Sequence, residues 1–431
     1  MSDPRTAAPS RRDVLRAAAV LAVAAGLGGC GKSDPETTGG QVTVDLWHGQ
    51  TDTAKKALDA LIAEFNRTHP DIAVIGGGGG VTADSMLQKV TAGLAAGSYP
   101  DVAYIFGSDL ASITRSPKVA DLSGQLQLDA VWPAAKAAIT VKDKVRAAPA
   151  LLDSLCVVYN KKLFAAAGLP APKAGWTWDD FVATAAKLTN PAKGVFGTGW
   201  PGVGDEDTVW RLWPMIWDLG GDVVSEDGKK VGFEQAGEQA LATLDKLRTD
   251  KSLYVDPKPG GEQLYQVFLG GRMGMVATGP WQLPDILDRK LDYGVVPLPS
   301  YSGKAVTISG PDTWTVFDNG SARVKAATEF VRWMLDAQQD VRWDLQGGSL
   351  PLSTTTAALP QWKKHAAETS GLQVFVDALE TARVRPTITA YPQISEHLGT
   401  AIVSVLLGKK SPADALKECV EQSNAVLAVP S

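Results

Sequence analysis

The sequence predicts an α/β protein with two lobes, and two observations point to that class. Between Val42 and Phe106, short β-rich runs alternate with segments of helical periodicity in the order β-α-β-α-β, which is typical of a largely parallel sheet covered by helices. The roughly 390 residues that follow the first 40 are more than one hydrophobic core usually supports. Because ligands of such sheets bind at the carboxyl ends of the strands, the loops at those ends are the first place to look for a site.

The first 29 residues are expected to be an export signal. The segment Ser10–Arg16 (SRRDVLR) matches the twin-arginine pattern, and Ala17–Leu27 is an apolar run too short to span a bilayer. The sequence Leu27–Cys30 (LGGC) matches a bacterial lipobox, so we expect the mature chain to begin with a lipidated Cys30 that holds it on the membrane. The alternative is an ordinary cleaved signal or a short anchor in which the cysteine is incidental.

Residues 30–40 are polar and contain Gly, Pro and Thr, so they are expected to form a flexible tether between the lipid and the folded part. Loss of residues 1–29 removes four arginines and two aspartates, which takes the formal net charge from −5 to −7. No basic patch remains, and this acidic balance argues against nucleic acid as a partner. The cysteines Cys156 and Cys419 either pair after export or remain buried free thiols. Neither they nor the four histidines show metal-ligand spacing, and no metal or cofactor is expected.

The elements of the β-α-β-α-β unit follow in order. Val42–Trp47 is the first strand, and the next segment carries Leu58, Leu61, Ile62 and Phe65 at helical spacing. That helix is expected over Thr53–Thr68, followed by a strand at Ile72–Ile75, a helix from Thr82 or Asp84 to Leu94, and an apolar strand at Asp101–Phe106. Further along we expect strands at Leu155–Asn160 and Met273–Val276, a capped helix opening in Trp176–Phe181, and helices or helical patterns at Ala236–Asp250, Leu264–Gly270, Thr328–Trp343 and Gln373–Leu406.

Several separated phrases occur in one order along the chain. They are Trp47 at the end of the first strand, Ile62–Asn66 leading to His69–Pro70, Pro100–Val102, Tyr159–Lys161, Trp176–Phe181, Phe268–Met273 with Met275, and Gly279–Trp281. Each phrase is weak alone. Together they make the chain from about Val42 to its C-terminus resemble the extracellular solute-binding proteins of the maltose-binding type.

The resemblance implies a two-lobe, periplasmic-binding-protein-like (type II) α/β fold with a hinge and a central ligand cleft. It implies lobe 1 at 41–150 plus 298–335 and lobe 2 at 151–297 plus 336–431. The expected hinges are Pro149–Asp153, Tyr293–Pro299 and Met334–Gln338. It also implies a monomer that binds a carbohydrate outside the cytoplasm, on the outer face of the bacterial cell membrane, and passes it to the permease subunits of an ABC importer, without catalysis.

A sugar offers apolar C–H faces and hydroxyl edges, so its site needs aromatic planes beside carboxylates or amides. The chain has thirteen tryptophans, and Trp281 is the foremost candidate because the family's Gly-Pro-Trp tryptophan stacks on the ligand. The alternative is that Trp281 packs under the hinge. In the first βα loop the resemblance implicates Trp47, Gln50 and Asp52, whereas His48 is expected to be a satisfied turn residue.

Other loops supply the remaining candidates. The resemblance places Phe106 and Asp109 after the third strand and Asp153 at a crossing between lobes, where the alternative is a charge on the hinge surface. Asp205, Glu206 and Trp210 belong to a loop that presents an aromatic in relatives. Two further loops contain Trp314, for which core packing is equally open, and Gly348. Near Ser395 and Glu396 the chain lacks the aromatic that some maltose binders carry, which argues against a maltodextrin-specific site.

Three alternative functions stay open. A binder of glycerol-3-phosphate or glycerophosphodiesters would share the fold, but the acidic residues would repel phosphate, and an arginine in the cleft would reverse that order. An extracytoplasmic glycoside hydrolase would need two carboxylates across a scissile bond, for which Asp109 and Asp153 are the available pair. An adhesion or scaffold lipoprotein would show no saturable binding of a small molecule.

Overall fold

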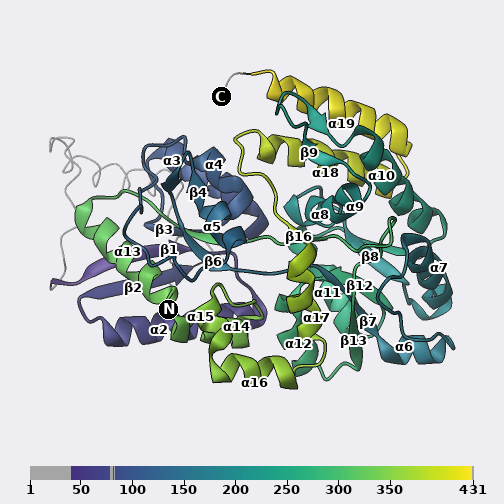
Figure 1. The fold of residues 1–431 in the computed structure, drawn as a ribbon, viewed down its shortest axis with the longest axis horizontal. Helices are drawn as coiled ribbons and strands as arrows, with labels where there is room; N and C mark the ends of the chain where they lie inside the picture. The colour runs from purple at the N-terminus through teal and green to yellow at the C-terminus, as the bar shows by residue number, and fades with distance from the viewer. Residues whose placement is uncertain (1–39, 78–80, 82, 430–431) are drawn as a thin grey trace, which may run out of the picture. The chain divides into compact units, whose positions relative to one another are not determined.

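The computed structural model describes residues 40–77, 81 and 83–429, and their contacts form one compact unit that begins at Gly40. The expected signal peptide, the lipidated Cys30 and nearly all of the tether lie outside the described residues. Two separate β-sheets organise the unit (Figure 1). We use lobe 1 for the part built on the five-stranded sheet and lobe 2 for the part built on the three-stranded sheet.

The sheet of lobe 1 confirms the expected parallel β-α-β-α-β unit and adds one strand of opposite direction. Its order is β2 (Ile72–Gly77), β1 (Val42–Trp47), β3 (Val102–Phe106), β15 (Asp312–Val316) and β6 (Ala148–Leu151). Strand β1 pairs in parallel with β2 and β3, whereas β15 is antiparallel to β3 and β6. Asp312 at the start of β15 therefore lies opposite Phe106 and Leu151, the last residues of β3 and β6.

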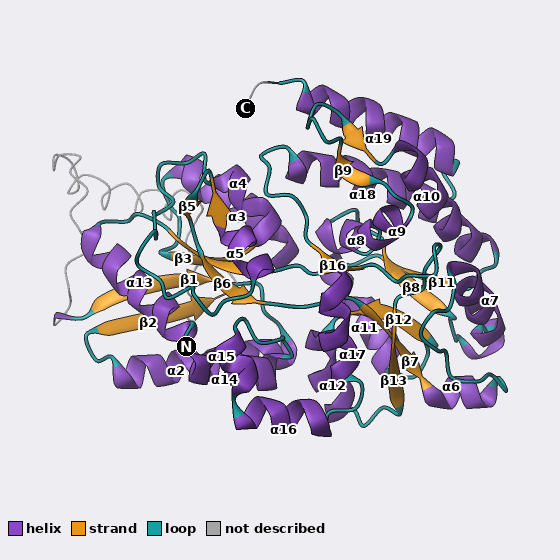
Figure 2. Ribbon diagram, in the orientation of Figure 1, coloured by secondary structure: helices purple, strands orange, loops and turns teal. Residues whose placement is uncertain are grey.

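Helices cover both faces of this sheet (Figure 2). On one face, α2 (Asp52–Thr68) and α13 (Ser321–Met334) share a core with Tyr104 of β3, and the stripe predicted for α2 is buried there. On the other face, α3 (Met86–Ala96), α4 (Leu110–Ile113) and α5 (Pro133–Ile139) pack with Ile105. The alternation of side chains along β3 thus fills two cores, which is why this strand is apolar at nearly every position.

Lobe 2 is built on the antiparallel sheet β12 (Met275–Thr278), β7 (Cys156–Asn160) and β13 (Tyr293–Pro297). Val157 and Tyr159 of β7 join a core with α7 (Trp178–Leu188), α10 (Glu234–Thr249), α18 (Tyr391–Leu406) and α19 (Pro412–Leu427). Cys156 and Val158 join a second core with α11 (Glu262–Leu269), α12 (Leu283–Asp288) and α17 (Leu372–Ala378). A parallel pair, β8 (Thr198–Pro201) and β11 (Leu253–Asp256), lies beside this sheet.

The other elements are short. The helices are α6 (Lys161–Ala166), α8 (Glu206–Trp210), α9 (Trp213–Asp218), α14 (Ala337–Gly347), α15 (Thr354–Ala358) and α16 (Pro360–Glu368). The strands are β4 (Thr140–Val141), β5 (Lys144–Val145), β9 (Asp222–Val224), β10 (Val231–Gly232), β14 (Thr307–Ile308) and β16 (Ala382–Arg383). Single 3₁₀ turns are η2 (Ala83–Ser85), η3 (Gly107–Asp109), η4 (Pro191–Lys193), η5 (Pro259–Gly261), η6 (Pro280–Gln282) and η7 (Leu379–Thr381).

Two long helical predictions are wrong as continuous helices. The pattern over 328–343 is divided between α13 and α14, because Asp336 is extended and its side chain accepts a hydrogen bond from the Gln338 amide, which caps a new helix. The pattern over 373–406 is interrupted by η7, β16 and an irregular segment at 384–388. Pro386 lies in that segment, and a proline disfavours helix both at its own position and at the preceding Arg385.

The chain passes from the sheet of lobe 1 to that of lobe 2 between β6 and β7, and returns between β13 and β15. Helix α14 packs against α2 of lobe 1. The predicted lobe boundaries and hinges stay predictions.

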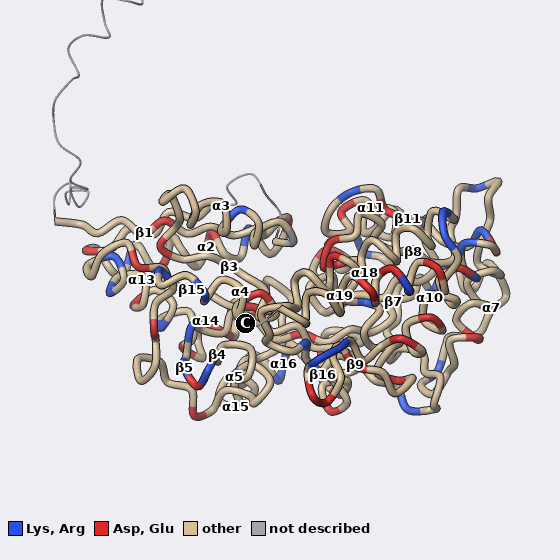
Figure 3. The backbone as a smooth tube through the Cα atoms, turned by 90° about the horizontal axis from the view of Figure 1, so that it is seen from above, with Lys and Arg blue, Asp and Glu red and all other residues tan. Residues whose placement is uncertain are grey.

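Both cysteines, Cys156 and Cys419, are buried free thiols. Among the described residues, none of the helices combines the length and the apolar character needed to cross a bilayer. Lysine and arginine positions are interspersed with aspartate and glutamate positions over both lobes (Figure 3).

Candidate functional site

A cavity of about 270 Å³ opens between the two lobes. Lobe 1 contributes residues at one edge of its sheet, namely Gly49, Gln50, Thr51, Asp52, Ala54, Ala83, Tyr104, Phe106, Leu151, Asp153, Gly310 and Asp312. The facing residues are Glu206, Asp207, Trp210, Pro259, Gly260, Glu262, Tyr265, Gln266, Leu269, Trp281, Gln282, Asp285 and Arg385. The cavity is therefore lined by both lobes, at the sheet edge where sequence reasoning expects a ligand.

The lobe 1 wall gathers polar groups from three strand ends. Gln50 follows β1. Its backbone amide donates to Nδ1 of the buried His48 at 3.3 Å, and this bond fixes the loop. Asp153 follows β6, and its Oδ1 accepts from the Gly310 amide at 2.6 Å. Asp312 begins β15, and its Oδ2 accepts from the Tyr104 hydroxyl at 2.5 Å. The antiparallel insertion of β15 is what brings Asp312 to the same edge as Asp153.

Two tryptophans form an aromatic wall in lobe 2. The rings of Trp210 and Trp281 lie 5.6 Å apart between centroids at an interplanar angle of 52°. A Cβ at position 279 would lie 1.8 Å from Cζ3 of Trp281, so only glycine lets this ring fold back over the backbone. Gly348 has φ +79°, and a Cβ there would lie 2.7 Å from the Trp281 Cα. Gly279 and Gly348 therefore both help to determine the position of Trp281.

Arg385 reaches the cavity from the irregular segment before α18. Its Nη1 donates to Oε1 of Glu206 at 2.7 Å, and its Cζ lies 5.9 Å from the Phe106 ring centroid. The same Oε1 accepts from the Tyr391 hydroxyl at 2.7 Å, and Oε2 of Glu206 accepts from the Ser395 hydroxyl. Burial alone would lower the pKa of Arg385, but the Glu206 carboxylate raises it, so the guanidinium stays charged.

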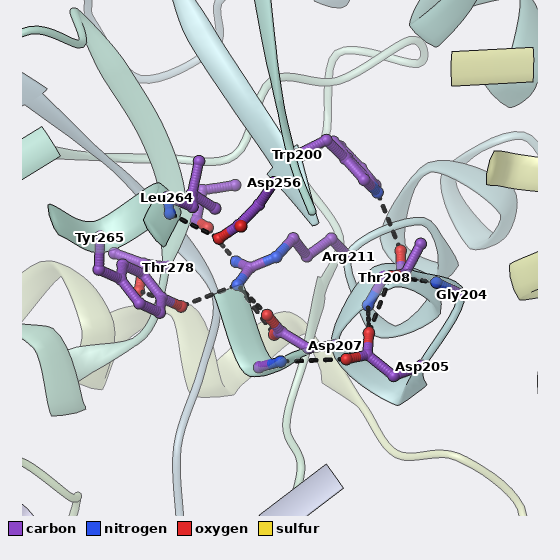
Figure 4. Close-up of polar contacts among 12 residues, drawn as sticks. Trp200, Gly204, Asp205, Asp207, Thr208, Arg211, Asp256, Leu264, Tyr265 and Thr278 are labelled. Carbon is purple, nitrogen blue, oxygen red and sulfur yellow. Dashed lines mark hydrogen bonds and ion pairs between the residues drawn. The ribbon is translucent and has the colours of Figure 1, made fainter. Parts of the chain in front are cut away.

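A second buried ion pair holds the lobe 2 wall in place (Figure 4). Nη2 of Arg211 donates to both carboxylate oxygens of Asp207, at 2.8 and 2.9 Å, and to the Tyr265 hydroxyl at 2.8 Å. Asp205 caps α8, since its Oδ1 accepts from the Thr208 amide at 3.1 Å while Oδ2 accepts from the Gly260 amide at 3.0 Å. These contacts join α8 to α11 and to the turn η5.

The cavity carries an excess of negative charge. Seven of its described lining residues are acidic (Asp52, Asp153, Glu206, Asp207, Glu262, Asp285 and Asp312), against the single cation Arg385. Burial raises the pKa of Asp153 to about 7, and burial together with the Asp153 charge raises that of Asp312 well above its ordinary value. Within the described part of the chain, no cluster of His, Cys, Asp and Glu is arranged to hold a metal ion.

The structure brings seven of the twelve predicted ligand residues together. Gln50, Asp52, Phe106, Asp153, Glu206, Trp210 and Trp281 all line the cavity. The role of each of these side chains in binding stays a prediction.

The other five predicted residues do not line the cavity. Trp314 is 1% exposed in the core of lobe 1, and the Trp47 indole donates to Asp45 at 3.0 Å while Lys89 lies over its ring. Asp205 is a helix cap and Gly348 supports Trp281. Asp109 is buried in η3, where burial and the Glu206 charge raise its pKa to about 7. The Asp109–Asp153 pair considered for a hydrolase is therefore not presented together at the cavity surface.

Sequence reasoning missed several lining residues. Asp312 lies two residues before the predicted Trp314, at the start of β15, a strand that is absent from the predicted elements. Arg385 falls within the helix predicted over 373–406, which would not present it to a cavity. Pro386, directly after it, is the sequence feature that indicates a break in that helix. Tyr104, Tyr265, Gln282 and Asp285 lie within strands, helices or turns and carry no local signal of exposure to a cavity.

Comparisons with known proteins agree with this architecture. The family model for the bacterial extracellular solute-binding protein matches residues 49–341. An sn-glycerol-3-phosphate-binding periplasmic protein of Pectobacterium atrosepticum is 23% identical over 91% of this chain and 93% of its own length. A lipoprotein of Streptomyces antibioticus is 26% identical over 87% of this chain and 84% of its own. The crystal structure of a cyclic α-maltosyl-1,6-maltose binding protein of Arthrobacter globiformis matches with a TM-score of 0.72 and 26% identity, over 90% of this chain and 100% of that one.

Proposed function

The chain belongs to the bacterial extracellular solute-binding proteins, and from that premise we propose that it captures a carbohydrate of one to a few rings between its lobes and delivers it to an ABC importer. One observation carries the proposal. The aromatic wall of Trp210 and Trp281 and the polar wall of Gln50, Asp153 and Asp312 line one cavity from different lobes. A sugar ring matches that pairing, because its C–H face packs on an indole while its hydroxyls meet amide and carboxyl groups.

Binding would draw the lobes together. A ligand favours the closed state only through contacts that the open state lacks, and a site divided between lobes provides such contacts. The Thr53 hydroxyl at the start of α2 donates to Oδ1 of Asp285 on α12, and this bond joins the two lobes at the cavity. Pro149–Asp153, Tyr293–Pro299 and Met334–Gln338 remain the proposed hinges.

A glycerophosphodiester ligand is the second candidate, and Arg385 favours it. An arginine in the cleft is the feature that would attract a phosphate, and one relative is described as a glycerol-3-phosphate-binding protein. However, Nη1 of Arg385 is bound to Glu206, and the lining acids outnumber the single cation. The negative electrostatic field in the cavity thus opposes a phosphate, so we prefer a carbohydrate as the ligand.

We also propose that the chain is exported by the twin-arginine route and held at the membrane by a lipid on Cys30. The support is the order of signals in residues 10–30 and the lipoprotein among its relatives. Cell fractionation of a Cys30→Ser variant tests this proposal. We expect the variant to leave the membrane fraction, and an unchanged membrane fraction would contradict the anchor.

A thermal-shift screen with monosaccharides, disaccharides and glycerophosphodiesters tests the function. A ligand that binds only the folded state stabilises it by about 2.7 kcal/mol at 100 times its Kd, so the true ligand raises the melting temperature. A shift with glycerophosphodiesters alone would favour the second candidate. Chromatography of the mixture separates binding from hydrolysis, because a binding protein returns the sugar intact.

Trp281→Ala tests the site with a matched control. We expect this variant to lose the sugar-induced shift while its unliganded form still melts cooperatively. Trp333→Ala is the control, because Trp333 is also a partly buried tryptophan but lies on α13 outside the cavity lining. A full shift retained by Trp281→Ala would refute the assignment of the aromatic wall.

A further inference from the structure

Asp153 and Asp312 line the cavity, and each has one carboxyl oxygen to which no described residue donates a hydrogen bond. They are 6% and 7% exposed. Oδ1 of Asp153 accepts from Gly310 and Oδ2 of Asp312 accepts from Tyr104, but no described residue donates to the second oxygen of either carboxyl. Two nearly buried carboxyl groups in one wall therefore offer free acceptors to whatever enters.

Among the described residues, too little positive charge lies near this wall. The cation whose field reaches both carboxyls is Arg385, and its Nη1 is bound to Glu206. Asp109 adds a further buried carboxyl to the same cluster, since its charge also acts on Asp312. Burial of an ionised carboxyl without a partner is costly, so the cluster is left short of a cation.

We propose that the ligand carries an ammonium group that binds between the free oxygens of Asp153 and Asp312, so that the carbohydrate of the proposed function is an aminosugar. An ammonium brings three donors and no acceptor, so it can bind both carboxyls once they have lost their protons to solvent. It also supplies the missing positive charge. This inference rests on the proposed function and narrows its ligand to one chemical class.

The protonation state of the two carboxyls distinguishes a ligand with an ammonium group from a ligand with a neutral hydroxyl in the same place. Burial raises the pKa of Asp153 to about 7, and burial together with the Asp153 charge raises that of Asp312 well above its ordinary value, with Arg385 opposing and Asp109 reinforcing the rise at Asp312. The empty pair therefore keeps a proton to a higher pH than exposed carboxyls do, and an entering ammonium displaces that proton. A neutral sugar places no charge beside the pair and has no reason to release that proton.

Isothermal titration calorimetry of matched ligand pairs tests the inference on the wild-type chain. The pairs are glucose with glucosamine and galactose with galactosamine, and N-acetylglucosamine is the uncharged analogue with the nitrogen retained. We expect the amine to bind about tenfold more tightly or better, because a buried charge-assisted contact replaces a neutral one. Titrations in buffers of different ionisation enthalpy are expected to show the release of about one proton for the amine and none for the neutral sugar.

Two variants distinguish the effect of the Asp153 and Asp312 carboxyls from the effect of the cavity's overall negative charge. Asp312→Asn is expected to reduce the preference for the amine to about threefold or less, since it removes one member of the pair. Glu262→Gln removes a charge from an exposed lining position and should keep the preference. Asp153→Asn serves as the second variant if Asp312→Asn does not fold.

The outcomes distinguish this inference from the proposed function. If a neutral sugar binds as tightly as its amine, or if Asp312→Asn keeps the full preference, the inference is overturned and a carbohydrate-binding function stands. If glycerophosphoethanolamine, which carries a primary ammonium, binds while every sugar fails, the carbohydrate proposal falls, and its preference over glycerophosphoglycerol decides whether the ammonium site survives. If none of these ligands binds, both proposals fall.

Discussion

Arg385 and Glu206 show how a single residue can govern both the cavity and the stability of the fold. Their side chains are 5% and 12% exposed, and Glu206 also accepts hydrogen bonds from Tyr391 and Ser395. Only two residues away, Arg383 pairs with Asp222 at a distance of 2.6 Å, but those two side chains are 43% and 48% exposed. The chain thus contains a buried and an exposed ion pair on the same short segment.

Replacement of each arginine by methionine should therefore have unequal effects. Arg385→Met leaves Glu206 buried with its charge uncompensated, and we expect the free energy of unfolding to fall by about 3 kcal/mol. Arg383→Met removes a solvent-screened pair and should cost less than about 1 kcal/mol. Urea unfolding of the three proteins measures both values, and equal losses would contradict the structural role given to Arg385.

Single residues could be predicted where a motif or a required glycine marks them. Trp281 was found because Gly279 and Pro280 precede it, and the structure shows that the ring needs that glycine. Trp314 is a weaker prediction, for which core packing is equally open in the sequence, and it lies in the core of lobe 1. The difference lies in the direction of a side chain on a central strand, which depends on the pairing of β15 with β3 and not on local sequence.

Helix α14 carries a second pair of buried carboxyls, one turn apart. Asp340 and Asp344 are 2% and 1% exposed, and one oxygen of each has no hydrogen-bond partner among the described residues. The other oxygens accept from the Leu352 amide at 3.2 Å and the Ser349 hydroxyl at 2.6 Å. The pair thereby anchors the turn that places Gly348 against Trp281.

This pair should make stability depend on pH in a defined direction. Burial raises the pKa of Asp340 from 3.8 to about 7, and burial together with the Asp340 charge raises that of Asp344 well above 3.8. At a pH between the ordinary pKa of an unfolded-state aspartate and the raised pKa of the folded state, the folded state holds a proton that the unfolded state has lost. The free energy of unfolding therefore falls as the pH rises from about 4 to 7 and above.

Asp344→Asn removes one of these groups and should weaken that dependence. We expect the variant to gain stability over the wild type at about pH 8 and to gain less at about pH 5, as measured by urea unfolding at both pH values. Asp288→Asn is the control, because Asp288 is exposed at the end of α12. A larger gain at pH 5 than at pH 8 would show that the pair is not protonated in the folded state.

Elements could be predicted where periodicity is local and caps are present. Helix α7 begins after Thr177, whose side chain and that of Asp180 form a capping box, as the sequence indicated. The break near Arg385 involves β16, which pairs with β14 about 75 positions earlier in the chain. A pairing over that separation leaves no periodic signal, so helical propensity alone gave the wrong element there.

At the scale of the whole molecule, the cavity exists because strands from distant parts of the chain end at one place. Tyr104, Asp153 and Asp312 come from three different segments, and β15 brings the last of them in from the opposite direction. The two-lobe fold could be predicted from the ordered landmarks, and the family comparison confirms it. The order of the strands in the sheet could not be predicted, because the place of β15 between β3 and β6 depends on pairing between distant parts of the chain.

A crystal structure of the chain with the sugar that gives the largest thermal shift tests the central claim most directly. The account predicts a ring packed on Trp281, with its polar groups against Asp153 and Asp312 and both lobes in contact with it. A sugar bound elsewhere on the surface, or one held by a single lobe away from Trp281, would contradict the account.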